Sequence, residues 1–351
     1  MSSSADDTGR SAIEGVESLF EPRVAIIGTD ELDEAVSVVT WAPDGARLAA
    51  GTLGGEVVLC GVDGRIIARL DTAAPVLDLS WSPGGEVVAA ACEDGSVWLW
   101  PAGGEPRRHA VGAAAEQLTW GPSGLAVAAG DAVVVLDEPG GDRVDLAVPF
   151  GGALVVTWTG AGLGATLLAG GLGGLREVMV AGASGEAWAR AAIVALAVDP
   201  TSGVAAAGTL GGDVEIGRGG PTLAAGRDAI SALAWSATGS HLAAVADGRL
   251  AVWTLHAADG TVTGPRRLVG HDDWVTGAAY APIGPLLASV GADGRLVLWD
   301  PDQTADPIER IELGGPLGAV AWRPDTSALA AGSRDGLLTV LDCSLLAPSS
   351  P

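Results

Sequence analysis

Short apolar stretches of five or six residues follow one another along the chain, separated by turns rich in Gly, Pro and Asp. At regular intervals such a stretch ends in a large residue that precedes a Pro/Gly turn, as in Trp81-Ser-Pro-Gly-Gly. These anchor residues are 37 to 45 positions apart and are Trp41, Trp81, Trp120, Trp158, Val198, Trp235, Tyr280 and Trp322. A period of about 40 residues broken into short strands predicts four-stranded propeller blades, because such units leave no room for paired helices.

The seventh repeat shows the expected blade most clearly. Its pattern predicts strands a to d at 275–280, 286–290, 295–299 and 308–313. Asp293-Gly294 separates strands b and c, and we expect a tight two-residue hairpin there, because Asp-Gly provides the positive φ angles that such a turn needs. The equivalent dipeptides in other repeats are Gly54-Gly55, Asp94-Gly95, Gly173-Gly174, Gly211-Gly212, Asp247-Gly248 and Asp335-Gly336.

The two ends of the repeat array complement each other. The eighth repeat stops after its strand c at 337–341, whereas an unpaired apolar segment at 23–28 precedes the first anchor. Placing this segment as the fourth strand of the last blade closes the ring and removes a free sheet edge. We therefore expect an all-β, eight-bladed propeller over 23–345, a disordered acidic leader at 1–22 and a short tail at 346–351, with a seven-bladed ring carrying one irregular insertion as the alternative.

The repeats resemble the WD-repeat family. In that family a His before strand a, a Ser or Thr on strand b, an Asp in the b–c turn and a Trp on strand c form a hydrogen-bonded set within one blade. The seventh repeat matches this structural set with His271, Ser289, Asp293 and Trp299, and Trp299 is followed by Asp300. The second and sixth repeats keep the Asp and Trp with the same spacing, as Asp94 with Trp100 and Asp247 with Trp253.

Composition and charge exclude several classes of enzyme and of binding partner. The chain contains no Lys, so it has no P-loop lysine, no Schiff-base lysine and no kinase strand lysine. Its net charge of −24 disfavours nucleic acid and anionic membranes as partners and favours basic or neutral proteins. The N-terminus lacks the pattern of a signal peptide, and no apolar run is long enough to cross a membrane. Three widely spaced cysteines suit a reducing cytoplasm.

No catalytic, cofactor or metal constellation is recognisable. The segment from Gly160 to Ala165 superficially resembles a dinucleotide-binding turn, but the glycines that follow would break the helix that such a site requires. The four histidines, His109, His241, His256 and His271, are expected on separate elements and do not converge. We therefore expect no cofactor and no enzyme activity.

The face that carries the d–a and b–c connections, called the loop face below, is the expected partner surface. Trp274 is the candidate anchor, because an aromatic residue in a loop suits an interface hot spot, although it could instead pack over the neighbouring blade. The other candidate contacts on this face are Asp272, Asp273, Glu93 and Arg334. The sequence thus predicts a non-catalytic scaffold that mediates protein–protein interactions. The alternative is a propeller enzyme or a small-molecule or metal-binding protein that uses the central channel.

Overall fold

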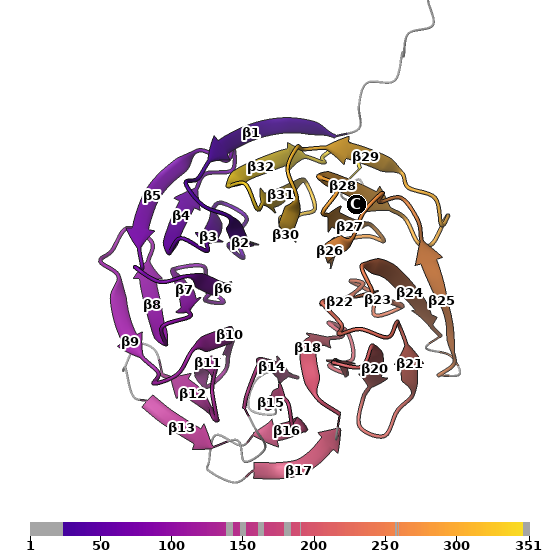
Figure 1. The fold of residues 1–351 in the computed structure, drawn as a ribbon, viewed down its shortest axis with the longest axis horizontal. Helices are drawn as coiled ribbons and strands as arrows, with labels where there is room; N and C mark the ends of the chain where they lie inside the picture. The colour runs from indigo at the N-terminus through magenta and orange to yellow at the C-terminus, as the bar shows by residue number, and fades with distance from the viewer. Residues whose placement is uncertain are drawn as a thin grey trace, which may run out of the picture.

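Eight four-stranded antiparallel sheets stand around a central axis as the blades of a ring (Figure 1). In this computed structural model the described residues are 24–346 apart from 138–142, 148–151, 161–164, 179–183, 190, 257 and 259. These residues form strands and turns and no helix. The predicted all-β, eight-bladed propeller is therefore confirmed, and the seven-bladed alternative is wrong. The predicted leader at 1–22 lies outside the described residues.

The strands of each blade run from the innermost to the outermost in chain order, except in blade eight. Blade one consists of β2 (Val36–Trp41), β3 (Leu48–Thr52), β4 (Glu56–Cys60) and β5 (Ile66–Asp71), and blade two of β6 (Val76–Trp81), β7 (Val87–Cys92), β8 (Ser96–Pro101) and β9 (Arg107–Ala110). Blade three consists of β10 (Ala115–Gly121), β11 (Gly124–Ala129), β12 (Ala132–Leu136) and β13 (Arg143–Ala147), and blade four of β14 (Val155–Thr159), β15 (Thr166–Gly171), β16 (Gly174–Val178) and β17 (Ser184–Ala189). Blade five consists of β18 (Ile193–Val198), β19 (Ala205–Thr209), β20 (Asp213–Ile216) and β21 (Thr222–Ala224), and blade six of β22 (Ala232–Trp235), β23 (His241–Ala246), β24 (Arg249–Leu255) and β25 (Val262–Leu268). Blade seven consists of β26 (Val275–Tyr280), β27 (Leu287–Gly291), β28 (Arg295–Trp299) and β29 (Glu309–Glu312), and blade eight of β30 (Leu317–Trp322), β31 (Ala328–Ser333), β32 (Leu337–Asp342) and β1 (Ala25–Glu31).

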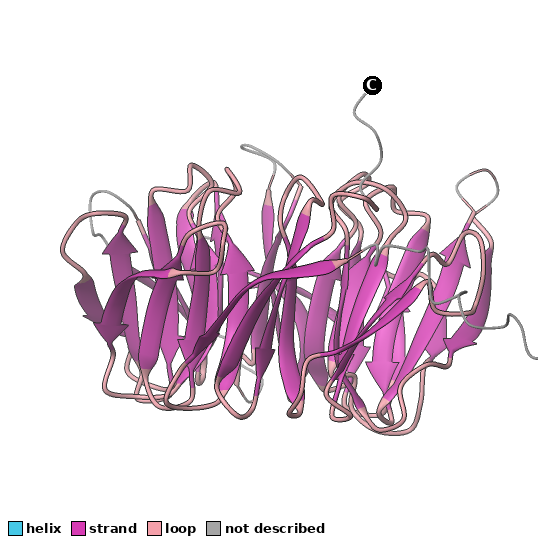
Figure 2. Ribbon diagram, turned by 90° about the horizontal axis from the view of Figure 1, so that it is seen from above, coloured by secondary structure: helices cyan, strands magenta, loops and turns pink. Residues whose placement is uncertain are grey.

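The hydrophobic core lies between neighbouring blades rather than at one centre. Between blades six and seven, for example, Leu250 and Val252 pack with Tyr280, Leu287 and Trp299 in one buried cluster. Each blade buries both faces of its middle strands against its neighbours, so β3 and β19 are buried along their whole length. The strands cross from one flat face of the ring to the other, with connections on both faces (Figure 2). The d–a and b–c connections form the loop face, and the a–b and c–d connections form what we call the opposite face.

The N-terminal strand closes the ring as predicted. β1 is the outermost strand of blade eight and pairs antiparallel with β32, with Thr29 opposite Thr339 and Glu31 opposite Leu337. The strand begins two residues and ends three residues later than the sequence predicts. Beyond it, the N–H of Leu32 donates to the carbonyl of Gly336 at 2.9 Å, and the Leu32 side chain is buried. The two ends of the chain thus share one sheet.

The aromatic anchors connect successive blades. In four blades the indole N–H donates to the backbone carbonyl of the residue just before the anchor of the preceding blade, at 3.0 to 3.3 Å. These pairs are Trp81 with Thr40, Trp120 with Ser80, Trp235 with Ala197 and Trp322 with Ala279. These four anchors therefore do more than fill the core, because each of them also joins the innermost strands of two blades. Among the described atoms, the Nε1 groups of Trp41 and Trp158 have no such partner.

The predicted two-residue b–c turns are wrong in most blades. In blade seven the N–H of Gly294 donates to the carbonyl of Gly291 at 3.2 Å, and Gly294 has positive φ whereas Asp293 does not. The connection is a four-residue turn with a left-handed glycine at its end, because Asp293 keeps an ordinary backbone conformation and uses its side chain to accept nearby N–H groups. Only Asp247-Gly248, with φ of 52° and 65°, has the predicted left-handed pair.

Polar side chains on the innermost strands add further links. The carboxylate of Asp78 on β6 accepts a hydrogen bond from the N–H of Leu118 in blade three at 2.9 Å. The amide oxygen of Gln117 accepts one from the N–H of Val156 in blade four, also at 2.9 Å. Burial raises the pKa of Asp78 to about 7, although the N–H groups of Leu118 and Leu79 act in the opposite direction. Ionisation of Asp78 therefore destabilises the folded state.

We expect the Asp78→Asn variant to unfold at a higher temperature than the wild type at pH 8. The folded-state pKa of Asp78 lies above its unfolded value, so its contribution to stability is largest at low pH and declines until the pH has risen through about 7. Asparagine keeps an acceptor for the Leu118 N–H without the charge. Thermal unfolding at pH 5 and pH 8 measures this, and an advantage that does not grow with pH would contradict it.

Candidate functional site

Four side chains form a continuous hydrogen-bonded set inside blade seven. The Nδ1 atom of His271 lies 3.0 Å from Oδ1 of Asp293, and its Nε2 lies 2.8 Å from Oγ of Ser289. The indole N–H of Trp299 donates to the same Ser289 hydroxyl at 2.9 Å. Burial disfavours the charge on Asp293, but hydrogen bonds from His271 and from the N–H groups of Asp272 and Arg295 hold its pKa below the usual value. The set ties the d–a loop to strands b and c.

The partial sets in blades two and six make different contacts. Asp247 accepts hydrogen bonds from the N–H groups of Arg227 and Asp228, so it holds the d–a loop of blade six without a histidine. Asp94 instead binds the Ser96 hydroxyl at 2.6 Å and the Arg108 guanidinium at 3.0 Å. Trp100 and Trp253 are buried in both cases. In these blades the acidic residues shape turns and loops rather than remaining open for a ligand.

The blade-seven set presents Trp274 on the loop face. The carboxylate of Asp273 accepts a hydrogen bond from the Trp274 N–H at 2.7 Å. Asp272 forms an ion pair with Arg295, and Arg295 also forms one with Glu312.

The Trp274 ring lies over Gly248, where an added Cβ atom would be only 2.6 Å from the ring. It remains 60% exposed, and the neighbouring Val269 is 77% exposed. The ring therefore packs over the neighbouring blade on one side and stays open to solvent on the other.

A groove of about 680 Å³ lies beside this ring, between blades six and seven. The d–a loop supplies Val269, Asp272, Asp273 and Trp274. Blade six contributes Arg249 and Arg267, which the sequence reading did not place here. The groove thus combines an aromatic wall with charges of both signs, as is common at protein interfaces, where an aromatic anchor lies within a polar rim.

Sequence reasoning missed a second apolar feature of the loop face. The tips of three b–c turns carry exposed leucines, Leu53 in blade one, Leu172 in blade four and Leu210 in blade five, which are 50 to 59% exposed. The available signal was the repeated Gly-Thr-Leu-Gly-Gly at Gly51 and Gly208, since a leucine within a glycine turn cannot reach a core.

Glu93 and Arg334 occupy the same turn position in blades two and eight as those leucines in their blades. Both are exposed, and their N–H groups donate to the carbonyls of Pro75 and Pro316. The structure therefore gathers Trp274, Asp272 and Asp273 in one loop, whereas Glu93 and Arg334 lie on other blades of the same face.

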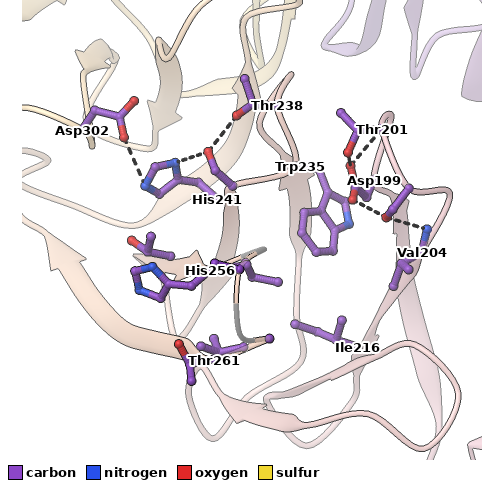
Figure 3. A pocket seen from close by; sticks show the side chains of 18 residues that line it. Asp199, Thr201, Val204, Ile216, Trp235, Thr238, His241, His256, Thr261 and Asp302 are labelled. Carbon is purple, nitrogen blue, oxygen red and sulfur yellow. Dashed lines mark hydrogen bonds and ion pairs between the residues drawn. The ribbon is translucent and has the colours of Figure 1, made fainter.

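Two of the histidines come together, contrary to the sequence expectation. His241 opens β23 and His256 follows β24, and both line a pocket of about 620 Å³ on the opposite face (Figure 3). Sequence reasoning separated them because it assigned them to different strands, but β23 and β24 form a hairpin that returns the chain to the same end of the blade. His109 lies on β9 and His271 in the blade-seven set, away from this pocket.

Other chemistry has little support in the described part of the chain. No three His, Cys, Asp or Glu side chains among the described residues are grouped as metal ligands would be. Within the same residues, no helix is long and apolar enough to span a membrane. The glycine segment from Gly160 to Ala165 lies between β14 and β15, where positions 161–164 are outside the described residues.

The model of the WD domain, G-beta repeat, matches residues 64–101, 221–254 and 265–300. Each match spans the outermost strand of one blade and the first three strands of the next, and the three matches contain Trp100, Trp253 and Trp299. Three blades of this β-propeller therefore carry WD repeats. The WD repeats recognised by the model are those of blades two, six and seven, the repeats whose Asp and Trp keep the family spacing.

Three relatives each match about one third of the chain or less. The chain is 28% identical over 115 residues to THO complex subunit 3 of Arabidopsis thaliana, 33% identical over 126 residues to human Coronin-7 and 33% identical over 84 residues to WD-40 repeat-containing protein MSI4 of Arabidopsis thaliana. These matches cover 32%, 34% and 22% of this chain but only 36%, 14% and 17% of the relatives. The crystal structure of the computationally designed protein Ika8 superposes with a TM-score of 0.71 at 18% identity, covering 89% of this chain and 98% of the design, and supports the fold.

Proposed function

We propose that this WD-repeat protein is a non-catalytic scaffold that binds protein partners through its loop face. The observation that carries the proposal is the exposed apolar surface there, in which Trp274 and Val269 lie beside a groove and three turn-tip leucines extend from other blades. Exposed aromatic side chains with a rigid support are favoured as interface hot spots. The blade-seven set supplies that support, because it fixes the loop on which Trp274 stands.

The nature of the partner follows from charge and shape. The net charge of −24 attracts basic proteins, does not oppose neutral ones, and repels nucleic acid and anionic membranes. Arg249 and Arg267 in the groove also accommodate an acidic side chain next to the apolar contact. THO complex subunit 3 is by its name a component of a larger assembly, which supports a scaffold role for this chain as well.

We also propose that the protein works in the cytoplasm. Cys60, Cys92 and Cys343 are all free and buried. Burial raises the pKa of the Cys60 and Cys343 thiols to about 12, so at neutral pH they stay protonated and behave as small apolar core residues. This use of cysteine suits a reducing compartment.

We expect the Trp274→Ala variant to lose partner affinity by about 30-fold, the loss typical of a hot-spot residue. The matched control is Ile283→Ala, because Ile283 is a similarly exposed apolar residue of blade seven on the opposite face. Affinity capture from native lysate with the wild-type chain identifies the partner, and titration of that partner with each variant measures the loss. Equal affinities for wild type and Trp274→Ala would contradict the proposal, as would a loss shared by Ile283→Ala.

A further inference from the structure

The pocket of about 620 Å³ on the opposite face lies between blades five and six and is completed by a loop of blade seven (Figure 3). Its volume falls within the roughly 300 to 1,000 Å³ of small-molecule sites. We propose that it binds a small organic amine, with the apolar body of the ligand against the pocket wall and its ammonium group at Asp302. This site is on the opposite face and is separate from the loop face.

The pocket has a deep apolar wall. Trp235, the anchor of blade six, and Ile216, the last residue of β20, line it and are themselves buried. Leu255 and Val262 extend the wall along blade six, and Val204 lies at the rim with 37% of its surface exposed. Because the Trp235 indole N–H is bonded to the Ala197 carbonyl, the ring is fixed. Such a surface binds an aromatic or aliphatic group by contact and by release of water.

The charged groups of the pocket select the sign of the ligand. Asp302 and Asp199 are acidic, and none of the described residues that line the pocket is an arginine, while the chain has no lysine. The nearby Arg266 donates to the Pro301 carbonyl and is not among the lining residues. Two carboxylates without a lining cation repel carboxylates and phosphates and attract an ammonium group.

The two carboxylates have different surroundings. Asp199 accepts hydrogen bonds from the N–H and hydroxyl of Thr201, both at 2.9 Å, and from the Ser202 hydroxyl, so its oxygens are used within its own turn. The Asp302 side chain is 57% exposed, and its contact within the pocket is Nε2 of His241 at 3.5 Å. Asp302 is therefore the group with room for an ammonium ligand.

His241 orients this corner of the pocket. Its side chain is only 7% exposed, and its Nδ1 lies 3.1 Å from the Ser240 hydroxyl, which is 2.7 Å from that of Thr238. Burial lowers the pKa of His241 and so favours the neutral form of the ring. Arg266 and His256 act in the same direction, whereas Asp302 and Asp300 oppose them. A neutral imidazole leaves the negative charge of Asp302 available and adds a hydrogen-bonding partner for the ligand.

A charge series with one apolar body tests the proposal. The probes are 1-naphthylmethylamine, 1-naphthylmethanol and 1-naphthoate, titrated into the full chain at pH 7 by calorimetry. We expect the amine to bind about tenfold more tightly than the alcohol, the difference expected of one charge-assisted hydrogen bond, and the anion to bind most weakly. Equal binding of the three probes, or no binding of the amine at millimolar concentration, would overturn the proposal.

Two variants and a control locate the site. Asp302→Asn is expected to reduce amine affinity about tenfold and to leave the alcohol unchanged, and Val204→Trp at the rim is expected to abolish binding of both by filling the pocket. The control is Asp306→Asn, which removes the same charge from an exposed position four residues away that does not line the pocket. If Asp306→Asn weakens the amine as much as Asp302→Asn, the effect comes from net charge and the site is refuted. Partner binding by the loop face is unaffected by these variants, so the two proposals fail separately.

Discussion

Deleting residues 1–31 is expected to lower the melting temperature by about 10 °C or more, or to abolish cooperative unfolding. The deletion removes β1, six of whose residues pair with β32, and the buried side chain of Val24. Each lost strand hydrogen bond costs about 1 kcal/mol, and β32 is left as a free edge in a ring that depends on closure. Circular dichroism during heating measures the change.

Two controls separate ring closure from chain length. Deleting residues 1–22, which precede the strand, should leave the melting temperature within about 2 °C of the full chain, because β1 and its pairing with β32 are kept. The point variant Gly28→Val should reproduce part of the effect of the long deletion, since an added Cβ at Gly28 would lie 1.9 Å from the carbonyl oxygen of Asp63 in blade one. If the 1–31 deletion melts with the full chain, closure by the N-terminal strand is wrong.

Replacing Ser289 by Ala is expected to lower the free energy of unfolding by about 2 to 4 kcal/mol, or the melting temperature by about 5 to 10 °C. The Ser289 hydroxyl is fully buried and bonds both the His271 ring and the Trp299 indole, so its removal leaves two buried polar groups without a partner. Chemical denaturation measures the loss.

The control for this variant is Ser231→Ala. Ser231 is exposed, and its hydroxyl makes one long bond of 3.4 Å to the Val245 carbonyl, so its loss should cost well under 1 kcal/mol. A Ser289→Ala protein as stable as the control would mean that the blade-seven set does not stabilise the blade. If stability falls as expected, the d–a loop that carries Trp274 should also lose rigidity, because Asp293 bonds the Asp272 backbone.

The strands could be predicted because their determinants are local. β26 and β28 have the predicted bounds, since an apolar run between Gly or Pro turns marks the ends of a strand directly. The closure by β1 followed from a missing fourth strand, which is a counting argument. The b–c turns were misjudged because Asp-Gly suits both a two-residue loop and a longer turn, and the side-chain bonds of Asp293 decide between them.

The sites were harder to predict because they combine distant parts of the chain. Trp274 could be recognised as a loop aromatic, but its contact with Gly248 depends on how two blades pack. The opposite-face pocket joins Asp199, His241 and Asp302 from three blades, and no spacing in the sequence reveals such a meeting. The turn-tip leucines Leu53 and Leu210, by contrast, were visible as Gly-Thr-Leu-Gly-Gly and were overlooked because apolar residues are usually assigned to the core.

Site-specific photo-crosslinking in native lysate tests the proposed partner surface most directly. A photoreactive phenylalanine derivative is introduced singly at Leu53, Leu210 and Trp274 on the loop face, and at Val62 and Ile283 on the opposite face, all of which are exposed. We expect the loop-face positions to form a covalent adduct with the same partner protein and the opposite-face positions to form none. Adducts confined to Val62 and Ile283 would contradict it.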